Sequence, residues 1–68
     1  VENSILFPGV VVEEGAVVRN CVLFKEDIVR RNAQLAYIIA DKDVEVLENR
    51  TLMGHATYPI VLAKGSIV

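Results

Sequence analysis

The chain has 68 residues, a net charge of −2 and no tryptophan, and 53% of its residues are hydrophobic. A chain of this length forms one domain at most, because a domain near this size buries only about 60% of its unfolded surface. The acidic balance provides no basic face for nucleic acid or anionic lipid, and no apolar run reaches the ~20 residues of a membrane span.

The sequence repeats itself at a lag of seventeen residues. When residues 1–20 are laid over residues 18–37, six pairs are identical: Val1/Val18, Asn3/Asn20, Leu6/Leu23, Phe7/Phe24, Val12/Val29 and Ala16/Ala33. Self-similarity at a short fixed period is typical of a solenoid, in which each unit buries its apolar face only against its neighbours. We therefore expect most of these residues to belong to the scaffold.

A finer period of five or six residues runs inside each unit. The first set of predicted inward positions is aliphatic or aromatic: Val1, Phe7, Val12, Val18, Phe24, Val29, Leu35, Ala40, Val46 and Leu52. The second set follows four residues later: Ile5, Val11, Ala16, Val22, Ile28, Ala33, Ile39, Val44, Arg50 and Ala56. Neither a helix nor a simple alternating strand has this period, whereas short strands joined by tight corners produce it. Polar residues such as Glu26 and Asp27 fall at the expected corners.

The prediction is an all-β, parallel β-helix of hexapeptide repeats, with three strands in each triangular coil, about three to four coils, and coils about 4.8 Å apart. Residues 1–53 form the repeat. Arg50 breaks the inward rule, so it is expected either to point outward or to find a carboxylate partner, and the corner is expected to distort there. The pattern fails near Gly54, and Pro59 belongs at an edge or a turn. Residues 54–68 are therefore predicted to form a C-terminal capping or docking segment.

The hexad pattern resembles the hexapeptide repeat of left-handed β-helices. The string from Asn3 to Gly9, running into Glu13-Glu14-Gly15, is similar to the C-terminal domain of bacterial glucose-1-phosphate adenylyltransferases (ADP-glucose pyrophosphorylases). The ending Tyr58–Gly65 is most like the accessory, regulatory subunit of glycogen biosynthesis. The resemblance alone implies the left hand of the coil, because most parallel crossovers are right-handed.

The resemblance implies an assembly and regulatory domain rather than a catalytic one. A missing N-terminal domain would convert ATP and glucose 1-phosphate to ADP-glucose and pyrophosphate with Mg²⁺, and this segment would need no cofactor. Expected partners are that domain, a catalytic subunit in a homo- or hetero-oligomer, and a sugar-phosphate effector. The lone cysteine suits a reducing cytoplasm. The alternatives are the β-helix of a hexapeptide acyltransferase, another sugar nucleotidyltransferase, and a purely structural oligomerisation domain.

Few residues have the chemistry of a site. Arg30 and Arg31 are the candidate effector-binding pair, because guanidinium groups bind phosphate oxygens bidentately and sugar phosphates regulate the family that the chain resembles. Asp43 and Glu48 are expected to neutralise part of this pair. The single histidine, His55, cannot form a three-histidine zinc site, and no catalytic or metal-binding residue is predicted. Cys21 is expected to be a small stacked residue, and Phe7 and Phe24 are expected to stack in register.

Overall fold

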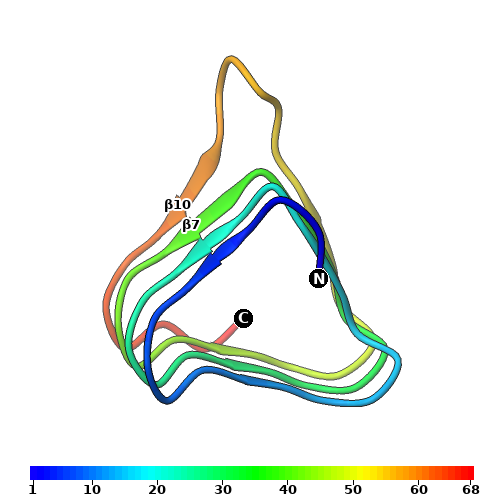
Figure 1. Cartoon of the computed structure of the whole chain (residues 1–68), viewed down its shortest axis with the longest axis vertical. Coiled ribbons are helices and arrows are strands. Elements are labelled where there is room, and N and C mark those ends of the chain that lie inside the picture. Colours follow the sequence, from blue (N-terminus) through cyan, green and yellow to red (C-terminus); the bar gives the residue numbers. More distant parts are fainter.

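In the computed structural model, which describes all 68 residues, the chain winds as a triangular coil with three parallel walls (Figure 1). The first wall consists of β1 (Ile5–Leu6), β4 (Val22–Leu23), β7 (Ile38–Ala40) and β10 (Ile60–Leu62). The second consists of β2 (Val11–Val12), β5 (Ile28–Val29) and β8 (Glu45–Val46), and the third of β3 (Val17–Arg19), β6 (Gln34–Ala36) and β9 (Thr51–Met53). The predicted parallel, all-β coil of stacked hexads is confirmed.

The register explains the repeat in the sequence. Val12 pairs with Val29 and Val29 with Val46, so equivalent residues of neighbouring coils lie seventeen positions apart. Backbone N–H groups of one coil donate to carbonyls of the next, for example from Ile5 N to Cys21 O at 2.9 Å. Short strands suffice because hydrogen bonds between coils continue through the corners. The polar corners also use left-handed backbone, as at Asn20 (φ 53°) and Asn32 (φ 58°).

An aliphatic core fills the triangle. It is built from ten buried residues: Val18, Cys21, Leu23, Val29, Ala33, Leu35, Ile38, Ala40, Val44 and Val46. These residues belong mainly to the two middle coils, because each middle coil is covered by another coil on both sides. The first coil lacks a cover on one side, and Val1 and Ile5 are 65% and 59% exposed.

The predicted inward positions are mostly correct on the third wall, but they are wrong by one residue on much of the first wall and at Val11 and Ile28 of the second. Cys21 and Leu23 are 1% exposed there, whereas Val22 and Phe24, which were predicted to point inward, are only half-buried. The predicted inward positions that are exposed or half-buried and outside the core are Val1, Ile5, Phe7, Val11, Val22, Phe24, Ile28, Ile39 and Ala56. Successive inward residues are six positions apart, except at one place in each coil where they are five apart. The structure puts this five-residue step between Val18 and Leu23, at the corner before the first wall, whereas the sequence pattern put it after the phenylalanines.

A loop at residues 54–59 projects from the corner between β9 and β10 (Figure 1). It adds five residues to the usual spacing, since Val61 pairs with Ile39, twenty-two positions earlier. Gly54 lies at its base, where a Cβ atom would approach the carbonyl oxygen of Tyr37 to 2.5 Å. After the loop, β10 continues the first wall. The division of the chain after residue 53 into a repeat and a cap stays a prediction.

Candidate functional site

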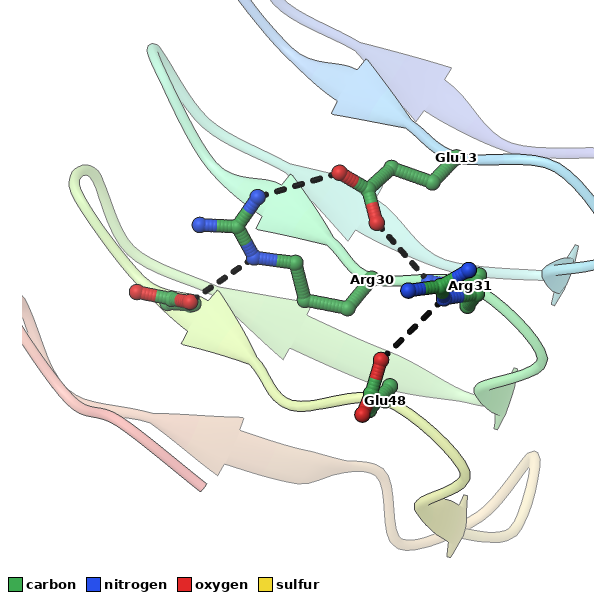
Figure 2. A network of polar contacts seen from close by, with 5 residues as sticks. Glu13, Arg30, Arg31 and Glu48 are labelled. Atoms are coloured by element: carbon green, nitrogen blue, oxygen red, sulfur yellow. Dashed lines mark hydrogen bonds and ion pairs between the residues drawn. The ribbon is translucent and has the colours of Figure 1, made fainter.

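A ladder of charged side chains crosses the second wall and the corner that follows it (Figure 2). Arg30 lies between two carboxylates, with its Nη1 atom 3.0 Å from Glu13 Oε2 and its Nε atom 2.8 Å from Glu45 Oε2. Next to it, Arg31 Nε lies 3.2 Å from Glu48 Oε2. The stacking of coils brings these residues together, since Glu13, Arg30 and Leu47 are equivalent positions of successive coils.

The charges of this ladder largely cancel. The hydrogen bond from Arg30 to Glu45, and then the one to Glu13, raises the pKa of the Arg30 guanidinium above its ordinary value. The other oxygen of the Glu13 carboxylate accepts the backbone N–H of Arg31 at 3.0 Å. Side chains in these pairs remain 29–68% exposed, so each pair contributes little to stability. Of the two predicted neutralising residues, Glu48 forms a pair with Arg31, whereas no ion pair joins Asp43 to either arginine.

An open hollow of about 400 Å³ lies beside the ladder. Its lining consists of Arg30, Glu45, Leu47, Glu48 and Arg50. Arg50, which was expected either to point outward or to pair with a carboxylate, is exposed and makes no ion pair. The hollow therefore contains one guanidinium group without a carboxylate partner. Whether Arg30 and Arg31 bind an effector stays a prediction.

Asp27 lies at a predicted corner and is the one charged residue that is buried. Only 1% of its surface is exposed. Its two carboxylate oxygens accept backbone N–H groups, Oδ2 from Phe24 at 2.9 Å and Oδ1 from Val44 at 2.8 Å. Burial raises the pKa of the carboxyl group, and these two hydrogen bonds lower it by less. The residue is a structural clamp that joins its own coil to the next one.

The remaining candidates do not form a nucleophilic site. Cys21 is buried, its thiol donates to the carbonyl of Arg19 at 3.1 Å, and burial raises its pKa, which disfavours the reactive thiolate. His55 lies exposed in the projecting loop, where its backbone N–H donates to Tyr58 O at 3.2 Å. The side chain of His55 makes no hydrogen bond. The geometry offers neither residue a catalytic partner.

Two other features bear on cofactors and location. No three histidine, cysteine, aspartate or glutamate side chains lie together in a group that could hold a metal ion. The Mg²⁺ implied by the resemblance was expected in the separate N-terminal domain and not in this segment. The structure also contains no helix with the length and hydropathy needed to cross a membrane. The predicted aromatic stack is confirmed, since the rings of Phe7 and Phe24 lie 4.8 Å apart and 8° from parallel.

Known proteins are similar in sequence to the chain. The chain is 37% identical over 49 residues to a glucose-1-phosphate adenylyltransferase of Acetivibrio thermocellus, covering 72% of the chain and 12% of that protein. It is 46% identical over 46 residues to a protein of the same name from Corynebacterium jeikeium, covering 68% of the chain and 11% of that protein. The chain thus spans about a tenth of the length of these relatives, and it aligns with their C-terminal region.

No solved structure shows a significant match to the chain. Residues 1–57 match the family model described as GlmU-like, C-terminal hexapeptide. This family indicates a left-handed β-helix, which fits the three parallel walls. The handedness of the coil comes from the family, because the sequence pattern alone does not determine it. The chain belongs to the GlmU-like C-terminal hexapeptide family.

Proposed function

We propose that the chain is the assembly and regulatory domain of a glucose-1-phosphate adenylyltransferase-like subunit in glycogen biosynthesis. The observation that carries this proposal is the pair of matches at 37% and 46% identity, both to the C-terminal region of proteins with that name. Conversion of ATP and glucose 1-phosphate to ADP-glucose belongs, in this proposal, to residues outside the 68, together with the Mg²⁺ it requires. The cytoplasm is the proposed location.

The structure supports a scaffold role. Most side chains near the coil axis are apolar, the one buried carboxylate makes structural hydrogen bonds, and the thiol is buried. The flat walls offer surfaces for the nucleotidyltransferase domain and for other subunits. The ending Tyr58–Gly65 favours the accessory, regulatory paralogue, which tunes a catalytic partner.

A chimera tests the proposal. The segment of the Acetivibrio thermocellus protein that matches this chain is replaced by residues 1–68, and a second variant simply lacks the segment. We expect the chimera to assemble like the parent enzyme and to form ADP-glucose, and the truncated variant to lose assembly. A chimera as impaired as the truncated variant refutes the assignment. A segment of equal length from a hexapeptide acyltransferase is the matched control, and it is expected not to rescue.

We also propose that the hollow beside the charged ladder accepts a sugar-phosphate effector. Arg50 supplies an unpaired guanidinium, and a phosphate entering the hollow competes with Glu45 for Arg30. In ¹⁵N-labelled protein at low salt, glucose 1-phosphate and inorganic phosphate are expected to shift the amide signals around residues 45–50. The Arg50→Gln variant is expected to lose these shifts, whereas Arg19→Gln, on another wall, retains them. Unchanged spectra at millimolar phosphate refute an effector site here.

A further inference from the structure

The corner between β9 and β10 carries a loop that the fold does not need. In the coil before it, Tyr37 alone joins β6 to β7, whereas residues 54–59 join β9 to β10 (Figure 1). After these residues, β10 resumes the first wall in register with β7. The five additional residues are therefore not required to close the corner. We call residues 54–59 the projecting loop.

Backbone contacts hold the projecting loop in one shape. Within it, His55 and Tyr58 exchange two hydrogen bonds, with N–O distances of 3.2 and 2.9 Å, and so form a tight turn. At its base, the Ile60 N–H donates to the carbonyl of Tyr37 at 3.1 Å, and a Cβ atom on Gly54 would lie 2.5 Å from the same oxygen. Tyr37 has a φ of 55°, a strained value for an aromatic residue that persists only where neighbouring contacts impose it. A loop that is rigid before contact loses little entropy on binding.

The projecting loop lies in the longest stretch of the chain without a charged side chain. Residues 51–63 contain no lysine, arginine, aspartate or glutamate, although 24% of the chain is charged. Tyr58 is 78% exposed, more than any other large hydrophobic residue, and Met53, which precedes the loop, is 45% exposed. The centres of protein–protein interfaces are depleted of charge and enriched in tyrosine and methionine, and a tyrosine that fills a pocket of the partner is a common hot spot. The loop therefore has the composition of a protein contact.

The position of the loop indicates which protein domain it contacts. One column of the third wall ends at the loop and consists of Glu2, Arg19, Ala36 and Met53. The polypeptide that enters the first coil at Glu2 therefore lies at the corner from which the loop projects, three coils or roughly 14 Å away. The chain spans about a tenth of the length of the adenylyltransferases that it matches. In the proposed function, the nucleotidyltransferase domain precedes the chain and is connected to it at this corner.

We propose that the projecting loop docks into an apolar pocket of the nucleotidyltransferase domain of the same subunit, with Tyr58 as its anchor. The inference rests on the proposed function, and it adds a contact that the flat walls do not make, because the loop extends beyond the triangular outline (Figure 1). The pocket must be apolar at its centre and must offer a hydrogen-bond partner to the tyrosine hydroxyl. Such a contact fixes the orientation of the nucleotidyltransferase domain on the β-helix.

Deleting residues 55–59 removes the projecting loop with little change to the coil. Gly54 then occupies the corner alone, at the position equivalent to Tyr37, and the spacing from Ile38 to Ile60 falls from twenty-two to seventeen residues. Glycine adopts the left-handed backbone of this corner at no steric cost. The deletion variant is therefore expected to keep the fold, as judged by circular dichroism, and to lose only the loop.

Hydrogen exchange followed by mass spectrometry tests the docking in the chimera of the proposed function, which joins residues 1–68 to the rest of the Acetivibrio thermocellus enzyme. We expect Tyr58→Ala to accelerate exchange in the loop at least about tenfold in the chimera and to leave it unchanged in the isolated chain. Ile67→Ala is the matched control, because Ile67 is also exposed, at 67%, but lies outside the loop. We expect the deletion variant of the chimera to lose its activity on heating at least about fivefold faster than the unmodified chimera, because the docked arm is absent.

Two outcomes overturn the docking alone. If a chimera that assembles and forms ADP-glucose has a loop that exchanges as fast as in the isolated chain, the loop has no partner in that domain. If protection of the loop increases with protein concentration, the loop contacts another subunit instead of its own. A chimera that neither assembles nor forms ADP-glucose refutes the proposed function, and the docking with it.

Discussion

Replacing Asp27 with alanine tests whether a buried carboxylate clamps two coils together. The carboxylate accepts the Val44 N–H at 2.8 Å and the Phe24 N–H at 2.9 Å. In the variant, Phe24 N–H retains the carbonyl of Ala40 at 3.1 Å, whereas Val44 N–H has no other acceptor in the fold. A buried donor without a partner costs about 1–3 kcal/mol, and alanine is too small to compensate by apolar burial. We therefore expect Asp27→Ala to lose about 1–3 kcal/mol.

Urea and thermal unfolding followed by circular dichroism at pH 7 measures this loss. A domain of this size has a total stability of about 3–10 kcal/mol, so the loss is a large fraction of it. The melting temperature is expected to fall by about 4–8 °C for each kcal/mol. Glu14→Ala is the control, since Glu14 is exposed and its side chain makes no hydrogen bond. If both variants unfold at the wild-type midpoint, the clamp contributes nothing and the reasoning is wrong.

Four further outcomes are expected. The stability advantage of wild type over Asp27→Ala is largest below the unfolded pKa of about 3.9 and shrinks as the pH rises through the raised folded pKa, as urea titrations at several pH values can check. Val29→Asp places an unpaired charge on the coil axis, where Val29 is 1% exposed, and is expected to abolish the cooperative melting transition. Arg30→Ala removes two partly exposed ion pairs and should lower the unfolding midpoint only slightly, with a smaller effect in 0.5 M salt. Glu26→Gly should raise the melting temperature by the equivalent of about 0.5–1 kcal/mol, because Glu26 has a φ of 62° where the first coil has Gly9.

The sequence predicted the architecture because the seventeen-residue repeat reflects the register in which neighbouring coils form hydrogen bonds. A lag of seventeen residues places Val12, Val29 and Val46 in one column, and those residues pair in the second wall. The aromatic stack follows from the same lag. Such predictions succeed because a solenoid uses local geometry again in every coil, so each identity in the repeat supports the others.

The inward positions of the first wall could not be read correctly because both of its faces are apolar. In the run Val22-Leu23-Phe24, every residue is a plausible core residue, and only the place of the five-residue step decides which one points inward. The structure puts that step before Leu23, at a corner where Asn3, Asn20 and Tyr37 have positive φ. The left-handed asparagines do not reveal the place of the step, since Asn32 and Asn49 have the same conformation at a corner where the spacing is six residues.

The error on the first wall has a physical origin in the apolar character of its outer face. A strand with one face on the core and the other in water alternates apolar and polar residues. This alternation shows which residues point inward. Where the alternation disappears, as at β4 and β7, the sequence loses the information about which side faces the core. The same loss means that the outer side chains suit an apolar neighbour as well as the inner ones do. The ambiguity of Val22 is therefore a consequence of an outer face that is as apolar as the inner one.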